Sequence, residues 1–175
     1  MAKKKTQEEI ERHKITQEVF TPQGVVESML SGLPDDTFDI SHKVLDNSCG
    51  EGNILLEVLK RKLSRCKNLE QGKTALKSIY GVEFMADNVM VCRQRLYDMF
   101  IQFFPDVAKD FIQNFKVRQI IRNRIQWHDA LTFDYDNWPK LVGRTPDKKH
   151  MNISFRERAS LWNKSYPMWC EEENI

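Results

Sequence analysis

The sequence predicts an α/β fold in which a parallel sheet has helices on both faces. Three short runs, at 43–46, 78–83 and 125–128, have the length and the apolar residues of buried strands. Segments with the helical spacing of apolar residues separate them. Strands that alternate with helices form parallel sheets through right-handed crossovers. A fourth, shorter run at 140–143 brings the expected number of strands to about four, fewer than a complete fold of this kind would have.

The first predicted helix opens with Thr21, a favoured N-cap residue, and Pro22, which suits the first helical position. Gly32 and Pro34 are expected to end it. Its apolar residues, Val25, Val26, Met29 and Leu30, are expected on one buried face. The later helices are predicted at 53–63, 89–103 and 111–121, with a polar connector over 64–77 that could contain a helical turn of its own.

The composition is typical of one soluble domain. Of the 175 residues, 41% are hydrophobic and 30% are charged, and a chain of this length can bury a substantial core. No apolar run is long enough to span a membrane, and the basic start at 1–5 leads into charged residues instead of a secretory signal. We expect an arm over 1–19, a core over 20–147 and a tail over 148–175.

The cysteines and the net charge exclude further classes of protein. The four cysteines are scattered, with no Cys-x-x-Cys pair, so neither a zinc site nor a disulfide framework is predicted, and we expect a reduced, cytoplasmic chain. A net charge of +2 does not by itself indicate nucleic acid binding. Five basic residues within 109–124 could contact phosphates, although a solvated helix face is the simpler interpretation.

The segment Asp-Asn-Ser-Cys-Gly-Glu-Gly, from Asp46 to Gly52, follows the first strand and is the first candidate for a ligand site. Its two glycines allow a sharp turn and a close approach of the backbone to a ligand. The helix that begins at Asn53 directs its free amides at that ligand, which suits a carboxylate. A dinucleotide site would need a third glycine at position 55, where Leu55 stands.

Acidic residues follow all three strands, and ligands of such sheets bind beyond the carboxyl ends of the strands. Asp46 suits an ammonium group, Glu83 suits the two hydroxyls of a ribose, and Asp129 suits the amine of an adenine. The aromatic ring of Phe84 can lie against that adenine. Each acid also has a structural alternative, such as a solvated strand end for Glu83 or a helix N-cap for Asp129. Taken together, the three indicate S-adenosyl-L-methionine.

Four motifs in this order resemble the gamma class of DNA adenine-N6 methyltransferases, which includes modification subunits of restriction systems. The motifs are Phe20-Thr21-Pro22, Asp46-x-x-Cys49-Gly50-x-Gly52, Gly81-Val82-Glu83 and Asp129-Ala130-Leu131. The resemblance extends from about residue 16 to residue 143. It implies a Rossmann-like S-adenosylmethionine-dependent methyltransferase fold, here incomplete, with S-adenosyl-L-methionine as the cofactor.

The resemblance also implies a role for each matching residue. Thr21 and the glycine turn would contact the methionine end, Glu83 the ribose, Phe84 the adenine face, and Asp129 with Ala130 the adenine edge. The residues expected around the cofactor are Phe20, Thr21, Asp46, Ser48, Cys49, Gly50, Gly52, Glu83, Phe84, Asp129, Ala130 and Leu131.

The family's catalytic segment, Asn/Asp-Pro-Pro-Tyr/Phe, has no good match in this chain. It accepts hydrogens from the N6 amine of a flipped adenine and stacks on the base. The segment 137–140 follows Asp129 too closely for a strand to intervene, so the catalytic position falls at 144–147, Arg-Thr-Pro-Asp. The guanidinium of Arg144 has five donors and no acceptor, and therefore cannot take a hydrogen from the amine. We expect no catalytic residue.

Three hypotheses of function follow. The chain is a DNA adenine methyltransferase that works only with a partner, a catalytically inactive S-adenosylmethionine-binding sensor, decoy or scaffold, or a nucleic-acid-binding module with an empty pocket. DNA is the expected substrate under the first hypothesis. Because the strand at 140–143 would be left at a sheet edge, a second copy or a complementing subunit is expected to cover it.

Overall fold

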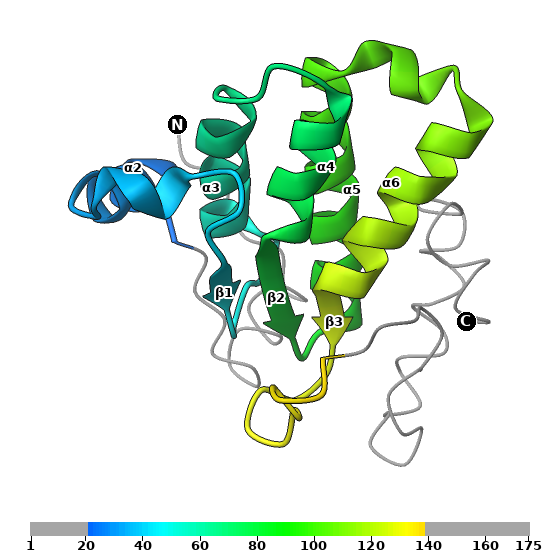
Figure 1. Ribbon diagram of the computed structural model, residues 1–175. Coiled ribbons are helices and arrows are strands. Elements are labelled where there is room, and N and C mark those ends of the chain that lie inside the picture. Colours follow the sequence, from blue (N-terminus) through cyan, green and yellow to red (C-terminus); the bar gives the residue numbers. More distant parts are fainter. Residues whose placement is uncertain (1–20, 139–175) are drawn as a thin grey trace, which may run out of the picture.

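The computed structural model describes residues 21–138, which form a three-stranded parallel sheet surrounded by helices (Figure 1). The strands, hydrogen-bonded in the order β1-β2-β3, are β1 (Val44–Asp46), β2 (Ile79–Glu83) and β3 (Ile125–Trp127). The α-helices are α2 (Gln23–Ser31), α3 (Asn53–Leu63), α4 (Leu69–Lys77), α5 (Ala86–Phe103) and α6 (Phe111–Arg124), with 3-10 helices η1 (Asp35–Phe38) and η2 (Pro105–Ala108). The predicted α/β fold is confirmed; the run at 140–143 lies outside the described residues.

The register of the sheet brings the carboxyl ends of all three strands to one edge. Val44 lies opposite Ile79, and Gly81 lies opposite Ile125, with both pairs of strands parallel. α4 leads directly into β2 and α6 directly into β3, so these helices stand at the opposite edge, where the strands begin (Figure 1). Within residues 21–138, the strands are therefore followed by loops at the lower edge of the sheet in Figure 1, which we call the open edge.

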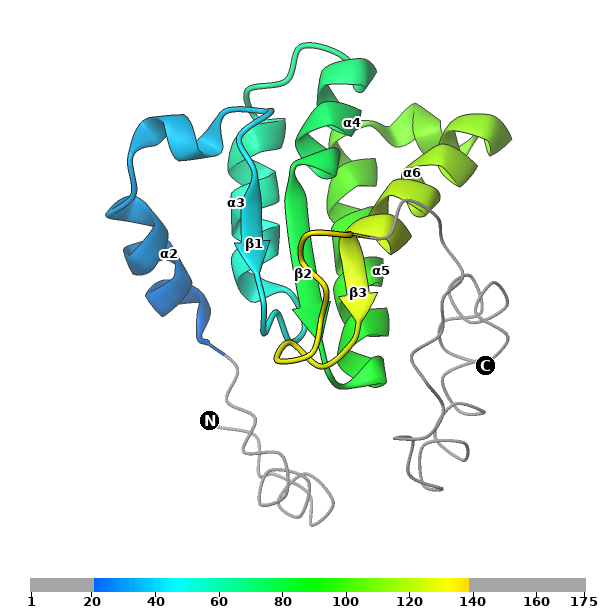
Figure 2. The ribbon, with the colours of Figure 1, turned by 60° about the horizontal axis from the view of Figure 1, so that its bottom comes forward.

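The two faces of the sheet are covered differently within residues 21–138. α3 and α5 pack against β2, and α5 also packs against β3; both helices lie behind the strands in Figure 2. The segment 128–138 passes in front of β2 in the same view. It carries Trp138 to the Tyr80 ring, with 4.8 Å between the ring centroids in an edge-to-face arrangement. An aromatic loop thus covers part of the face opposite α3 and α5.

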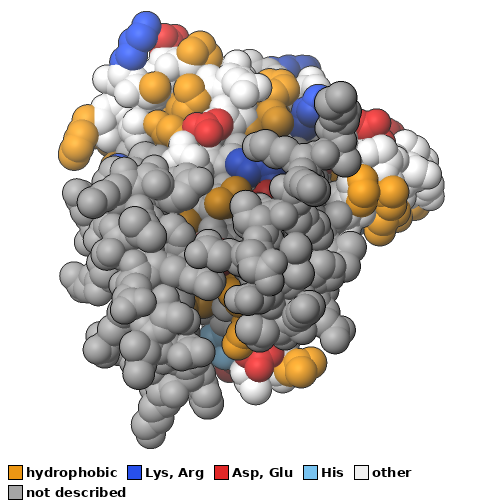
Figure 3. Space-filling view, turned by 180° about the vertical axis from the view of Figure 1, so that it is seen from behind, with side chains coloured by type: hydrophobic (Ala, Val, Ile, Leu, Met, Phe, Trp, Pro, Cys, Tyr) orange, Lys and Arg blue, Asp and Glu red, His pale blue; other side chains and the backbone are white. Residues whose placement is uncertain are grey.

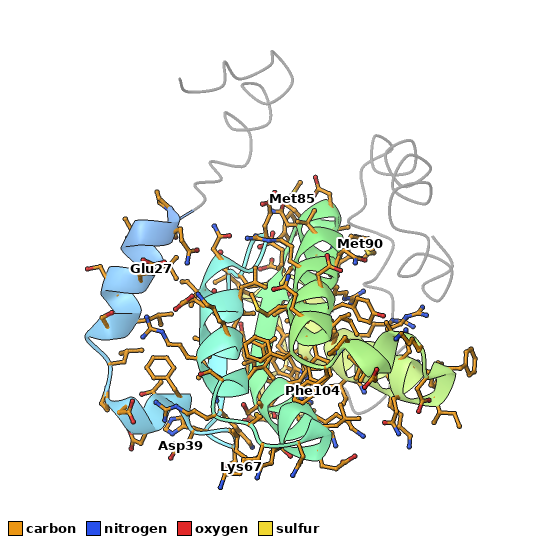
Figure 4. All side chains as sticks on the ribbon, turned by 90° about the horizontal axis from the view of Figure 1, so that it is seen from above. Glu27, Asp39, Lys67, Met85, Met90 and Phe104 are labelled. Atoms are coloured by element: carbon orange, nitrogen blue, oxygen red, sulfur yellow. The ribbon has the colours of Figure 1, made fainter. Side chains whose placement is uncertain are left out.

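Within the polar segment 64–77, residues Leu69–Lys77 form the helix α4, so the connector is more helical than the single turn that the prediction allowed. Its N-cap Asn68 accepts a 3.0 Å hydrogen bond from the amide three residues later. Few apolar residues suffice because the helix is short: Leu76 is fully buried, and Gly72 lies directly under the ring of Phe104. Figure 4 shows Phe104 between the helices. A glycine in a polar stretch therefore marks close helix packing here.

The prediction that the apolar residues of α2 share one buried face was wrong. Val26 and Leu30 are buried against the core, whereas Val25 is 48% exposed and Met29 is 54% exposed. The helix packs on α3 along one side only, and successive residues are turned by about 100°, which leaves a second apolar stripe outside. Apolar side chains are visible on this projecting helix at the right of Figure 3.

The basic residues of 109–124 were interpreted as a solvated helix face, and this interpretation was wrong for the last two, Arg122 and Arg124. Arg122 is only 3% exposed. Arg124 donates from Nε to the carbonyl of Lys77 at 2.8 Å, and its guanidinium lies 4.6 Å from the centre of the Tyr80 ring. α6 also continues three residues beyond the predicted end, to Arg124. Arg124 thus joins the helix to the end of α4 and to β2.

Lys62, on α3, is fully buried and fastens the start of the sheet. Its ammonium donates to the carbonyl oxygens of Asp39 (2.9 Å) and His42 and to the hydroxyl of Ser78 (2.9 Å). The hydroxyl of Ser78 donates in turn to the Ala75 carbonyl, so it can only accept from the lysine. All three ammonium hydrogens thus have an acceptor. Burial lowers the pKa of Lys62 to about 8.

This lowered pKa predicts that stability rises with pH above neutrality. Between about pH 8 and the ordinary lysine value of about 10.4, the folded state holds Lys62 neutral while the unfolded state still binds the proton. Because the unfolded state then binds more protons, its formation becomes less favourable as the pH rises. Urea unfolding at pH 7.5 and 9.5, with Lys62→Met as reference, measures the slope. Equal slopes in the two proteins would rule out a titrating Lys62.

Candidate functional site

The residues predicted to bind a ligand lie in three loops at the open edge of the sheet (Figure 1). β1 ends at Asp46, β2 ends at Glu83 and β3 ends at Trp127, and the sheet places these ends side by side. The backbone amide of His128 donates to the Glu83 carbonyl at 3.0 Å, which extends the pairing of β2 and β3 into the loops. All predicted site residues except Phe20, which lies outside the described residues, are thus brought to one edge.

The glycine turn has the left-handed backbone that its two glycines predict. Gly50 has φ 51° and Gly52 has φ 83°, values that only glycine adopts without a steric penalty. The turn is closed by a 2.7 Å hydrogen bond from the Gly52 amide to the Cys49 carbonyl. The Cys49 amide donates to the Val82 carbonyl at 3.1 Å, which fixes the turn to β2.

Replacing Gly52 with alanine is expected to destabilise the fold by about 2–4 kcal/mol. The cost of a positive φ in alanine and the cost of overpacking add together. The new Cβ would stand 2.6 Å from the Sγ of Cys92. Gly24→Ala is the matched control, because nothing lies within 4 Å of its added Cβ and alanine favours a helix. It should be neutral or stabilising by up to about 1 kcal/mol. Urea unfolding measures both; equal effects would argue against a tightly packed turn.

Glu83 joins the glycine turn to the end of β2. It is 7% exposed, and its two carboxylate oxygens accept separate backbone amides at 2.8 Å, from Gly50 and from Met85. The side-chain amide of Asn88 lies 3.5 Å from the oxygen that binds Met85. The alternative of a solvated strand end is therefore wrong.

Asp46 and the N-terminus of α3 stand on either side of the turn. Burial raises the pKa of Asp46, while a 3.2 Å hydrogen bond from the Ser48 amide acts in the opposite direction. A partly desolvated carboxylate of this kind is stabilised by a cation. α3 begins immediately after Gly52, and its first amides have no carbonyl one turn earlier to bind. The turn thus offers a negative group and an anion-binding helix end close together.

Cys49 is a buried thiol within this turn. A hydrogen bond with the Cys92 side chain, burial, and the nearby charges of Asp46 and Glu83 raise the pKa of the Cys49 thiol well above its usual range. It is therefore protonated at neutral pH and packs as a small apolar group. On β2, Gly81 makes room for it, since an added Cβ there would lie 2.9 Å from the Cys49 Sγ.

Phe84 and Asp129 face the solvent side of this edge. The Phe84 ring is 61% exposed, while its carbonyl accepts a 3.0 Å hydrogen bond from the Trp127 indole. Asp129 Oδ1 accepts the amide of Leu131 at 2.9 Å in a turn. No helix begins there within the described residues, so the N-cap alternative for Asp129 was wrong. Ala130, which follows Asp129, is partly buried, and Leu131 is exposed.

Two positions were considered for the catalytic segment, at 137–140 and at 144–147. The position proposed for it, 144–147, lies outside the described residues. The rejected position begins with Asn137, whose side-chain amide binds the Asp134 carboxylate at 2.9 Å, and Trp138, whose indole binds the Asn123 carbonyl at 2.6 Å. No strand separates Asp129 from Asn137. The side chains of Asn137 and Trp138 thus both form hydrogen bonds within the chain.

A protein-family model described as N-6 DNA methylase matches residues 8–102, more than half of the chain. The chain belongs to the N-6 DNA methylase family. The match includes the glycine turn and Glu83 and ends before Asp129. No curated protein and no solved structure matches the chain. Enzymes of this family act on adenine N6 in DNA and normally use S-adenosylmethionine.

Two residues contact the glycine turn or the segment before α2 and were not among the predicted site residues of this methylase-family chain. Asn53, the first residue of α3, donates from Nδ2 to the Thr21 carbonyl at 2.9 Å. Arg95, on α5, donates from Nη1 to Asn53 Oδ1 and to the Glu51 carbonyl, both at 2.8 Å. The place of Asn53 directly after Gly-x-Gly was a signal in the sequence, but its partners are 32 and 42 residues away.

Thr21 itself has a different local role from the one predicted. α2 begins at Gln23 with Pro22 as its N-cap, so Thr21 is not the capping residue. The Pro22 carbonyl accepts the amides of Val25 and Val26 instead. Thr21 lies two residues before the first residue of the helix, and its carbonyl accepts the Asn53 side-chain amide.

No helix among residues 21–138 is long and apolar enough to cross a membrane. The described part of the chain also contains no cluster of histidine, cysteine or acidic side chains suited to a metal ion.

Proposed function

We propose that the chain binds S-adenosyl-L-methionine at the open edge of its sheet and acts as a DNA methyltransferase-like protein that does not transfer the methyl group by itself. The observation that carries the proposal is the Glu83 carboxylate, which ties the glycine turn to the end of β2 beside Phe84. The family match supports a DNA methyltransferase-like function independently of this geometry.

The described residues fit such a cofactor from end to end. The methionine carboxylate suits the free amides at the start of α3, and its ammonium suits the partly buried Asp46. Glu83 would accept the ribose hydroxyls, the exposed ring of Phe84 would lie against the adenine, and Asp129 would accept the adenine amine. The cofactor would supply the electrophilic methyl group, and the protein would supply its orientation.

The proposed catalytic silence rests on the sequence at 144–147. An adenine N6 amine needs acceptors for its hydrogens, and Arg144 offers donors only. The enzyme hypothesis requires another chain to supply those acceptors. We propose a complementing subunit or a second copy as the partner, and DNA as the shared substrate.

Calorimetric titration with S-adenosylmethionine tests the binding proposal. Binding with a micromolar dissociation constant is expected, with S-adenosylhomocysteine also bound because it keeps the amino acid, ribose and adenine. Asp129→Asn should weaken both ligands, since its amide presents a donor to the adenine amine, whereas Asp134→Asn, in the same loop, should not. Absence of heat with either ligand at millimolar concentration would defeat the proposal.

A transfer assay with labelled methyl groups on adenine-containing DNA tests the proposed silence. The purified chain is expected to transfer no label above the level of a heat-denatured control. Transfer by the chain alone would contradict the role assigned to Arg144 and establish an autonomous enzyme. Transfer that appears only when a second protein is added would identify the complementing subunit.

A further inference from the structure

We infer that Asn53 and Arg95 are positioning residues of the cofactor site, which hold Thr21 against the glycine turn so that the methionine end is enclosed between them. The inference rests on the proposed function. It concerns two side chains of α3 and α5, and it explains how three parts of the chain that are distant in sequence form one wall.

The orientation of the Asn53 amide is determined by its two partners. Arg95 can only donate, so the Asn53 atom that faces its Nη1 at 2.8 Å must be the oxygen. The Asn53 nitrogen is thereby directed to the Thr21 carbonyl, 2.9 Å away, which can only accept. Reversing the amide would place a donor against a donor and an acceptor against an acceptor. The relay therefore has one arrangement.

Arg95 is itself held by Glu51 as well as by Asn53. The same Nη1 binds the Glu51 carbonyl at 2.8 Å, and the Glu51 carboxylate lies 3.8 Å from it. Glu51 is the residue between the two glycines of the turn. Arg95 thus contacts the turn and the first residue of α3 at once, and α5 serves as the rigid support.

The Thr21 end of the relay lies in the motif that precedes α2. The Asn53 bond joins residues 32 positions apart, from the segment before α2 to the N-terminus of α3. That N-terminus is where the proposed methionine carboxylate binds. Loss of the bond should therefore affect the methionine end of a ligand, while the adenine end, held by the loops after β2 and β3, is unaffected.

The test compares two ligands that differ in the amino acid and in the charge of the sulfur, which only S-adenosylmethionine carries as a sulfonium. S-adenosylmethionine carries the amino acid, whereas 5′-methylthioadenosine keeps the adenine, ribose and sulfur without it. For Asn53→Ala we expect about 10-fold weaker binding of S-adenosylmethionine, as the loss of one or two hydrogen bonds predicts. Binding of methylthioadenosine should stay within about twofold. Asn114→Ala is the matched control, because Asn114 also donates a part-buried 2.8 Å hydrogen bond, to Tyr97, far from the site.

Arg95→Met provides a second variant that leaves Asn53 in place. It should weaken S-adenosylmethionine binding about as much as Asn53→Ala, and the double variant should be little worse than either, because the two act in series. If both ligands weaken in parallel in each variant, the role is merely structural and the inference is wrong. If the variants bind S-adenosylmethionine as the wild type does, the inference is wrong while the proposed function stands. If the wild-type chain binds neither ligand, both the inference and the proposed function are wrong.

Discussion

Glu83→Gln is expected to weaken S-adenosylmethionine binding by about 100-fold, which corresponds to about 2.7 kcal/mol. Both carboxylate oxygens accept a backbone amide, from Gly50 and from Met85. Glutamine replaces one oxygen with a donor, so one buried amide must lose its partner. An unpaired buried group costs about 1–3 kcal/mol, and the turn is no longer held against β2. Calorimetry measures the loss of binding, and urea unfolding the loss of stability.

Glu27→Gln is the control for this change. Glu27 lies on the exposed side of α2 (Figure 4), and its carboxylate contacts only the Gln23 side chain among the hydrogen bonds described. Its replacement should leave both affinity and stability unchanged within about 0.5 kcal/mol. Should Glu83→Gln behave like Glu27→Gln, the carboxylate would not be the link between the turn and the strand.

Lys62→Met is expected to cost about 3–5 kcal/mol of the free energy of unfolding, because it leaves several buried acceptors unpaired. The carbonyls of Asp39 and His42 and the Ser78 hydroxyl each lose a donor. Methionine fills a similar volume, so an empty cavity is not the cause. Since Lys62 joins the segment before β1 to the start of β2, the loss should weaken the whole sheet.

Lys60→Met is the matched control, two residues earlier on α3. The Lys60 side chain is 57% exposed and forms a 3.6 Å ion pair with Glu57, a surface contact of the kind that contributes little. A change below about 1 kcal/mol is expected in urea unfolding. If the two substitutions had similar effects, the hydrogen bonds of Lys62 would carry no special weight.

The sheet and its loops could be predicted from the sequence because their signals are local. Each strand is a short apolar run, and Gly50 and Gly52 occur where the backbone adopts positive φ. The acids at the strand ends lie together because parallel strands end at one edge. By contrast, α4 contains few apolar residues and is determined by Asn68 and by the contact of Gly72 with Phe104, neither of which has a periodic pattern.

The side-chain contacts of the site could not be predicted from local patterns. Glu83 was expected to face a ligand, and its bonds to the Gly50 and Met85 amides depend on how the turn folds over β2. Asn53 and Arg95 meet only because α3 and α5 pack together, the most extensive helix contact of the described chain. Such pairs lie tens of residues apart, where hydrophobic spacing carries no information.

The location of cofactor binding is most directly tested by amide chemical shifts of the labelled full chain during titration with S-adenosylmethionine. The account predicts that the amides of the glycine turn, of Phe84 and Met85, and of 129–131 shift together with a single dissociation constant. Amides of α4 and η2, at the opposite edge of the sheet, should stay unchanged. Shifts confined to those distant helices, or no shifts at millimolar ligand, would contradict the assignment of the site to the open edge.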